Sequence, residues 1–190
     1  MPYVRCPNCG LTTYSTRNRS LASECPGCGE PLWEGEDDAA TRAERSAKAA
    51  IAGALALARD QLGMDVALVT ELAEERELVL ENAGEWPPVG SLEGGAVPLE
   101  ETFCNALLEG RIEQLVADAA SDERVRDLAL SRDLGVRAWI GVPLTVTDAR
   151  IYMLCCLARE ARPDLGDDAI RFLTGLAETV RTQLAPAGYT

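Results

Sequence analysis

Four cysteines near the N-terminus have the spacing of a metal site. Cys6 and Cys9 form one Cys-x-x-Cys turn, Cys25 and Cys28 form a second, and a glycine follows each turn. Such a turn lets two thiolates reach one ion, and two turns complete a tetrahedral site with four sulfur ligands. The pattern predicts a bound zinc ion, with iron in the same four-sulfur site as the alternative.

The predicted metal is structural rather than catalytic. Four protein ligands leave no position open for a reacting water, and a segment as short as residues 1–32 buries too little surface to fold without a metal. Disulfides are the other interpretation of these cysteines. The chain begins Met-Pro-Tyr-Val-Arg-Cys, without the apolar run of an export signal. We therefore expect a cytoplasmic protein with reduced thiols and no membrane segment.

The repeated turn resembles the zinc-ribbon family, with residues 11–14 as its short strand. Residues 1–32 would then form the ribbon, and residues 33–38 an acidic linker. Zinc ribbons often bind nucleic acid, and Arg17 and Arg19 lie between the two turns. The net charge of −13 opposes this use, because it repels a phosphate backbone. Docking to a protein is the favoured use of the ribbon.

The rest of the chain predicts an α+β fold built around one strongly apolar hairpin at residues 137–159. Its two runs are apolar at odd and even positions alike, so both faces of the hairpin must be buried. Apolar residues at helical spacing predict a first helix over residues 39–62 and a last helix over residues 167–184. These stripes are Ala47, Ile51, Ala54 or Leu55, Ala58 and Leu62, and Ile170, Leu173, Ala177, Val180 and Leu184.

Shorter elements are predicted between the first helix and the hairpin. Strands are expected at residues 64–71, 77–81, 97–99 and 114–117. A short helix begins after residues 100–102 and ends at Gly110. Residues 83–95 read as a loop rich in proline and glycine, and residues 118–135 as one or two irregular helical turns.

This order of elements, with the blocks at residues 97–110, 116–126, 140–144 and 152–156, resembles the GAF domain. The Ile-Gly-Val-Pro-Leu sequence at residues 140–144 is its most specific part. The resemblance assigns residues 39–186 to a GAF domain and residues 187–190 to a tail. It implies an antiparallel sheet with the first and last helices on one face. The other face and the middle segments would enclose a small-molecule pocket.

Departures from known GAF subtypes limit the functions. The chain lacks the signature of cyclic-nucleotide GAF domains, and it has no histidine, which normally accompanies the pigment cysteine of bilin-binding relatives. The missing histidine also excludes Ser-His-Asp and Cys-His catalysis. Cys104 falls near one cysteine of the relatives that reduce free methionine sulfoxide, but residues 118–126 contain no thiol where that family's catalytic cysteine is expected.

The resemblance suggests the residues that line the ligand pocket. They are Trp86, Cys104, Trp139 and Tyr152. Cys104 is also the candidate for a redox-reactive thiol, since the first turn of a helix lowers a thiol pKa, whereas the nearby Glu100 and Glu101 raise it. Cys155 and Cys156 are expected to be buried hydrophobic residues.

The sequence therefore predicts a non-enzymatic sensory or regulatory module. It would bind an unknown small molecule and signal through a homodimer formed by the first and last helices, or through a protein partner. A cysteine-based redox sensor, or an enzyme like the methionine sulfoxide reductases, is one alternative. Docking of nucleic acid or protein through the zinc ribbon is the other.

Overall fold

The computed structural model describes residues 3–6, 8–14, 25–29, 39–73, 75–147 and 150–189. The chain separates into two units, Met1–Arg42 and Ala43–Thr190, which are described one at a time. The predicted acidic linker at residues 33–38, the arginines 17 and 19, and Asp148 and Ala149 of the hairpin turn lie outside the described residues.

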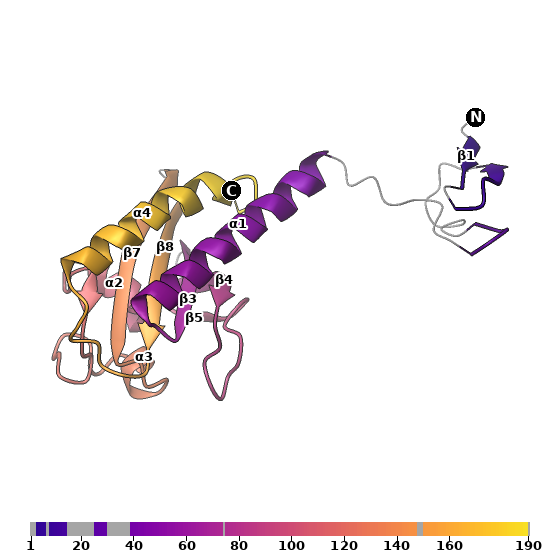
Figure 1. Cartoon of the computed structure of the whole chain (residues 1–190). Coiled ribbons are helices and arrows are strands. Elements are labelled where there is room, and N and C mark those ends of the chain that lie inside the picture. Colours follow the sequence, from indigo (N-terminus) through magenta and orange to yellow (C-terminus); the bar gives the residue numbers. More distant parts are fainter. Residues whose placement is uncertain are drawn as a thin grey trace. The chain divides into compact units, whose positions relative to one another are not determined.

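The N-terminal unit contains a short antiparallel hairpin (Figure 1). Strand β1, Tyr3–Arg5, pairs with strand β2, Thr12–Tyr14, with Arg5 opposite Thr12. The first Cys-x-x-Cys turn connects these two strands, so the hairpin fixes both ends of that turn. The second turn, at residues 25–29, is separated from this hairpin in the sequence by residues 15–24, which lie outside the described residues.

The second unit is built on a six-stranded sheet with the order β5-β4-β3-β8-β7-β6, in which all neighbouring strands are antiparallel. Strands β7 and β8 form the predicted hairpin, and the other edge of β8 pairs with β3, so that β3 and β8 are the two central strands. The strands are β3 Val66–Ala73, β4 Arg76–Ala83, β5 Ala96–Pro98, β6 Leu115–Val116, β7 Ala138–Thr147 and β8 Arg150–Ala158.

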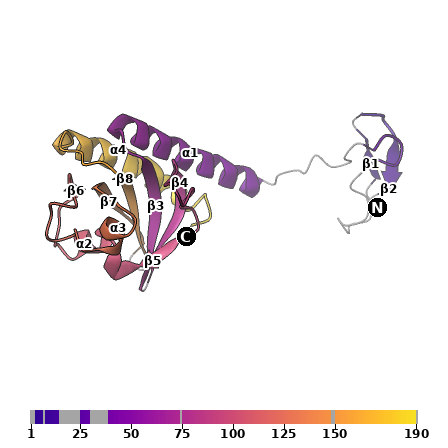
Figure 2. The ribbon, with the colours of Figure 1, turned by 90° about the horizontal axis from the view of Figure 1, so that it is seen from below.

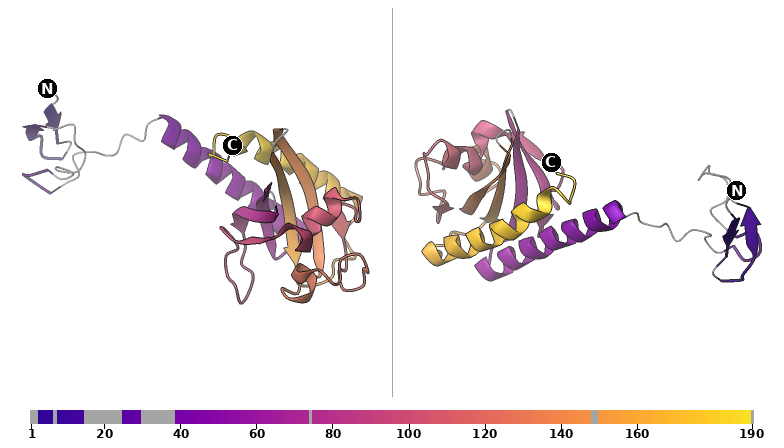
Figure 3. Two further views of the ribbon diagram at one scale, coloured as in Figure 1. Left: turned by 180° about the vertical axis from the view of Figure 1, so that it is seen from behind. Right: turned by 90° about the horizontal axis from the view of Figure 1, so that it is seen from above.

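Two long helices cover one face of the sheet, which we call the helix face. Helix α1, Ala39–Leu62, and helix α4, Asp167–Leu184, lie side by side on it (Figure 3). Both bounds match the sequence prediction. The predicted stripes are buried against the sheet, except that Ile170 is only partly buried. The α+β class, with the first and last helices on one face of an antiparallel sheet, is therefore confirmed.

Short elements and loops cover the opposite face, which we call the loop face (Figure 2). They include the 3-10 helix η1, Leu99–Glu101, the six-residue helix α2, Phe103–Leu108, and the four-residue helix α3, Ala129–Arg132. Thr102 caps α2 by accepting a hydrogen bond from the backbone N–H of Asn105 at 3.2 Å. These elements enclose a second core that is separate from the helix-face core.

The hairpin divides its side chains between the two faces as its sequence predicts. On β8, Met153, Cys155 and Leu157 belong to the loop-face core, whereas Tyr152, Leu154 and Cys156 belong to the helix-face core. All residues from 152 to 158 are buried. The two-sided burial that the apolar pattern demands is therefore present in the fold.

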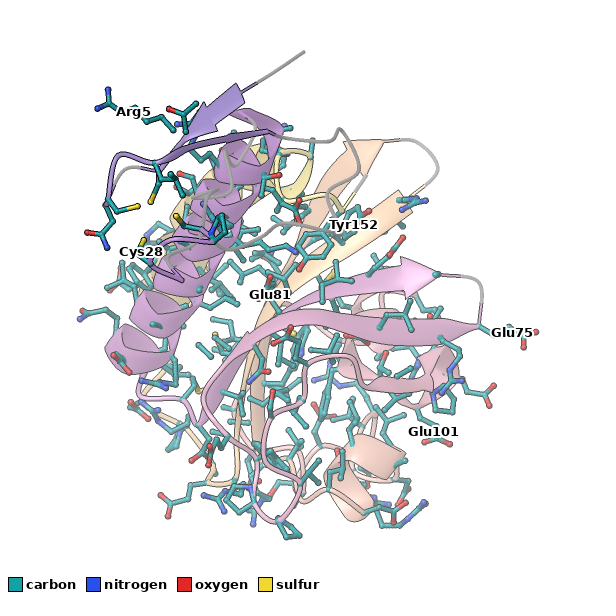
Figure 4. The ribbon with its side chains drawn as sticks, turned by 90° about the vertical axis from the view of Figure 1, so that its right-hand side faces the viewer. Arg5, Cys28, Glu75, Glu81, Glu101 and Tyr152 are labelled. Atoms are coloured by element: carbon teal, nitrogen blue, oxygen red, sulfur yellow. The ribbon has the colours of Figure 1, made fainter. Side chains whose placement is uncertain are left out.

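The C-terminal residues differ from the sequence prediction. Residues 187–190 were expected to form a tail, but Ala187 is buried in the helix-face core and Tyr189 packs against it. The Tyr189 hydroxyl donates a hydrogen bond to Glu81 at 2.6 Å, and the Tyr152 hydroxyl donates one to the Tyr189 carbonyl oxygen. Figure 4 labels Tyr152 and Glu81 in this region. These polar contacts hold residues 187–189 on the domain.

Replacing Gly141 by alanine should destabilise the sheet. A β-carbon at Gly141 would lie 2.8 Å from the Cη2 atom of Trp139, so the buried ring would have to move. We expect the free energy of unfolding to fall by roughly 1–3 kcal/mol. Gly53→Ala is the control, because Gly53 lies in α1 with open space around it. The free energy of unfolding of Gly53→Ala should rise by about 1 kcal/mol, because alanine favours the helix more than glycine does. Denaturant titration measures both, and an unchanged stability for Gly141→Ala would contradict the packing described here.

Candidate metal centre and ligand face

The structure brings the four N-terminal cysteines together into one cluster, called here the four-thiol cluster. The sulfur atoms of Cys6 and Cys28 lie 3.7 Å apart, and those of Cys9 and Cys25 lie 3.5 Å apart. All four sulfurs are within 4.8 Å of one another, and none of the four cysteines forms a disulfide. Sulfurs on one tetrahedral zinc ion are separated by about 3.8 Å, whereas a disulfide bond is about 2.05 Å long. The observed separations therefore fit a shared metal ion.

Both Cys-x-x-Cys turns have the same backbone geometry. Gly10 and Gly29, which follow the second cysteine of each turn, have φ angles of 74° and 73°. Each donates its N–H to the carbonyl of the first cysteine, Gly10 to Cys6 at 3.0 Å and Gly29 to Cys25 at 2.8 Å. Glycine adopts this left-handed conformation without strain. The two glycines thus let the turns close tightly enough to present both thiols on one side.

Electrostatics in the four-thiol cluster also suit a cation. The backbone N–H of Cys9 lowers the pKa of Cys6 to about 7. A hydrogen bond from Leu11 lowers the pKa of Cys9, but the neighbouring thiols of Cys25 and Cys28 together raise it by more, so the net pKa is about 12. A metal ion removes this conflict, because it stabilises every thiolate at once. With only sulfur donors, the cluster suits zinc or iron.

Three of the four predicted ligand-binding residues lie together on the loop face. Trp86, Cys104 and Trp139 are all buried there. The Trp139 ring stacks on Phe103, with ring centroids 5.8 Å apart and an interplanar angle of 13°. The indole N–H of Trp86 donates a hydrogen bond to the Leu134 carbonyl at 3.1 Å. Each aromatic ring is thus fixed by packing or by a hydrogen bond.

The fourth residue, Tyr152, lies on the other side of the sheet. It belongs to the helix-face core and bonds to Tyr189. Tyr152 precedes Met153 of the loop face, and successive side chains on a strand point to opposite faces. The structure therefore does not bring Tyr152 together with Trp86, Cys104 and Trp139.

Cys104 has a protonated, buried thiol. It lies in α2, as predicted, but its pKa is well above the usual value, first because of its hydrogen bond with Cys155 and then because of burial. The expected lowering by the helix start is therefore outweighed. Burial likewise raises the pKa of Cys156.

Sequence reasoning gave no role to Glu77, which the structure places beside Cys104. Glu77 is only 5% exposed, and one of its carboxylate oxygens lies within 4.8 Å of the sulfurs of both Cys104 and Cys155. The signal available in the sequence was alternation along β4, which puts Glu77 and the partly buried Val79 on the same side of the strand.

Comparisons with known proteins agree with this architecture. The family model described as "GAF domain" matches residues 46–184. No sequence of a curated protein matches the chain significantly. Among the described residues, no helix combines the length and apolar character needed to cross a bilayer.

Solved structures share the fold at low sequence identity. The phycocyanobilin-bound GAF domain of a cyanobacterial phytochrome has a TM-score of 0.57 at 15% identity, over 78% of this chain and 94% of that one. The free methionine-R-sulfoxide reductase of Neisseria meningitidis, in complex with its substrate, has 0.55 at 15% identity, over 78% and 87%.

The chromophore-binding domain of a bacteriophytochrome from R. palustris has a TM-score of 0.56 at 15% identity, over 77% of this chain. The match covers only 61% of that relative's length. At these identities the likeness concerns the fold alone. It does not extend to the chemistry of the individual relatives.

Replacing Cys9 by alanine should remove one metal ion per chain, because the four-thiol cluster would lose a quarter of its donors. Cys156→Ala is the matched control, since Cys156 is buried in the helix-face core and belongs to neither group of metal-ligating side chains found among the described residues. Its metal content should equal that of the wild type. Elemental analysis of the purified full chain measures both, and equal metal content in the Cys9→Ala and wild-type chains would contradict a metal in this cluster.

Cys104 should resist alkylation in the folded protein. We expect no iodoacetamide adduct on Cys104 at pH 8.5, where an ordinary thiol of pKa about 8.5 is half ionised. Its raised pKa and burial keep it protonated and shielded. Peptide mass mapping measures the adduct, and the same protein unfolded in guanidinium is the control. Rapid labelling of Cys104 in the folded chain would instead indicate a reactive, redox-sensing thiol.

Proposed function

Because the chain belongs to the GAF domain family, whose model matches residues 46–184, we propose that it is a non-enzymatic regulatory module. Its GAF domain binds a small molecule on the loop face, between the sheet and the short elements that cover it. Trp86, Cys104 and Trp139 are the residues of this face that we assign to ligand binding.

The different covers of the two sheet faces carry this proposal. The helix face is closed by α1 and α4, which run the length of the sheet and bury continuous apolar stripes. The loop face is closed by η1, α2, α3 and the loops between them. Short elements contribute few contacts each, and segments of low local stability are those that open to admit ligands. The loop face is therefore the side on which a ligand can enter.

A small number of polar contacts holds this cover in place. The Glu101 carboxylate accepts a hydrogen bond from the backbone N–H of Ala129 at 2.7 Å, which ties η1 to the start of α3. Figure 4 labels Glu101 on the side of the sheet away from α1. Arg137 contacts Asp118 at 2.8 Å, and this guanidinium lowers the pKa of the Asp118 carboxyl. These contacts join separate parts of the cover, so a ligand that rearranges one part changes the others.

Two of the relatives support a small-molecule role. One is a GAF domain with bound phycocyanobilin, and the other is a reductase in complex with its substrate. For this chain we propose a ligand other than a bilin, because the chain contains no histidine to accompany a pigment cysteine. Reductase activity is disfavoured as well, since the Cys104 thiol is protonated and residues 118–126 contain no cysteine.

For the N-terminal unit we propose a zinc ribbon with a structural zinc ion. In this unit the first turn connects the paired strands β1 and β2, and the two turns together bring four thiols close to one another. Binding of zinc to such a site releases protons and contributes directly to folding, on the order of 10 kcal/mol in zinc-finger peptides. The ribbon would dock to a protein rather than to nucleic acid, because the chain carries a net charge of −13. A homodimer through α1 and α4, or a protein partner, would carry the signal.

Native mass spectrometry of the purified full chain tests ligand binding. We expect a non-covalent organic adduct of constant mass that is released on denaturation. Met153→Phe should lose it, because the larger ring fills the loop face, whereas Leu154→Phe should keep it. The two positions are neighbours on β8, both fully buried, and face opposite sides of the sheet. Each substitution should cost a similar 1–3 kcal/mol, roughly, from overpacking.

Circular dichroism confirms that both variants fold. The native mass spectrum also reports the number of subunits, which we expect to be two. A wild-type chain without any organic adduct would contradict the proposal. So would an adduct that survives equally in Met153→Phe and Leu154→Phe, because the ligand would then lie elsewhere.

A further inference from the structure

A second group of metal-ligating side chains is buried inside the GAF domain. It consists of Glu77, Cys104 and Cys155, whose ligand atoms all lie within 4.8 Å of one another. Glu77 is 5% exposed, Cys104 2% and Cys155 1%. No residue of this group belongs to the four-thiol cluster.

Three different elements bring these residues together. Glu77 lies on β4, Cys155 on β8 and Cys104 on α2. In the sheet, Leu72 pairs with Glu77 and Leu68 pairs with Cys155, and both leucines of β3 contribute to the loop-face core. Both sheet residues therefore project toward the loop face, and α2 delivers Cys104 onto them. The convergence depends on the whole fold and not on a local turn.

One oxygen of the Glu77 carboxylate lacks a partner, although the side chain also interacts with the Cys104 thiol. The Oε2 atom of Glu77 is buried without a hydrogen-bond partner, and so is the hydroxyl oxygen of Thr70. Thr70 pairs with Met153 of the loop face and lies on β3 two residues from Leu72, the partner of Glu77, and two residues from Leu68, the partner of Cys155. A buried polar atom without a partner is destabilising, and more so when it is charged. Two such atoms beside two thiols indicate that a polar group completes the site.

A metal cation is the group that suits these donors best. The ionisable residues of the group are a carboxylate and two thiols, all of which are neutral or negative. The ion pairs among the described residues do not include Glu77. A cation would give Oε2 a partner and would bind the sulfur atoms of Cys104 and Cys155 at the same time.

We propose that Glu77, Cys104 and Cys155 form a second metal site, which takes a thiophilic divalent cation of the zinc class. Sulfur donors select this class over magnesium and calcium, which prefer oxygen. On binding, the metal forms bonds to two sulfurs and one carboxylate oxygen, and the two thiol protons leave to solvent. Three protein donors leave one position of a tetrahedral ion open to a water or a ligand atom. The site goes beyond the proposed small-molecule function and does not depend on it.

The same two thiols do not favour a disulfide switch. A disulfide would use only the two thiols and would leave the Oε2 atom of Glu77 without a partner. Both sulfurs are also shielded from a dissolved oxidant by burial. Cation binding is the chemistry that uses Glu77 as well as both thiols.

Zinc counting on the full chain tests the second site. After metal removal and reloading with Zn²⁺, native mass spectrometry should show two ions per wild-type chain and one per Cys155→Ala chain. Cys156→Ala is the matched control and should retain two, because Cys156 is the next residue on β8, equally buried, and faces α4 instead. Glu77→Gln, which keeps the size of the side chain and removes its charge, should weaken binding of the second ion at least tenfold.

Cobalt spectroscopy isolates the site from the four-thiol cluster. A full chain with Cys6→Ala and Cys9→Ala should bind one Co²⁺ and show thiolate-to-cobalt absorption, and the addition of Cys155→Ala should abolish this absorption. Circular dichroism establishes that each variant is folded. Three results would overturn the proposal. They are a single zinc ion in the wild-type chain, an unchanged zinc count in Cys155→Ala, and a disulfide between Cys104 and Cys155 in the purified protein. An organic adduct, present or absent, leaves these readouts unaffected, so the two proposals fail separately.

Discussion

Burial of strand β8 on both faces is the constraint on which the sheet domain depends. Residues 152–158 are all buried, so the sheet needs a cover on each side. On one side the cover is two long helices, and on the other it is a set of short elements. The domain thus has two separate cores, one on each face of the sheet, and the sheet lies between them. The two faces of the domain therefore differ, since two long helices cover one face and several short elements cover the other.

The elements that repeat a simple pattern could be predicted from the sequence. The bounds of α1 and α4 follow from apolar stripes at helical spacing, and the division of β8 between two faces follows from alternation. The four-thiol cluster could be predicted for a related reason. Its ligands come in two local turns, and a Cys-x-x-Cys turn brings its own pair of thiols together whatever the rest of the chain does.

The parts that depend on long-range contacts could not be predicted. Glu77 reads as one more charged strand residue, and only the fold shows that α2 and β8 bring two thiols to it. Residues 187–189 read as a short tail in the sequence, whereas in the fold Tyr189 donates a hydrogen bond to Glu81 and accepts one from Tyr152, both of which lie on the sheet. Tyr152 lies on the opposite face from Trp86 and Trp139, and its contact with Tyr189 is the part that its sequence context does not indicate. In each case, the deciding contact joins residues that are far apart in the chain.

The adjacent cysteines of β8 have a further consequence. Cys155 and Cys156 share one peptide unit, yet each is embedded in a different core. Protein interiors are close-packed, so a displaced side chain moves its neighbours. A displacement of Cys155 would therefore move the shared peptide unit and disturb the packing around Cys156 in the helix-face core. A change on one face of the sheet would then reach the other face through two adjacent residues of one strand, without a route around the edges of the sheet.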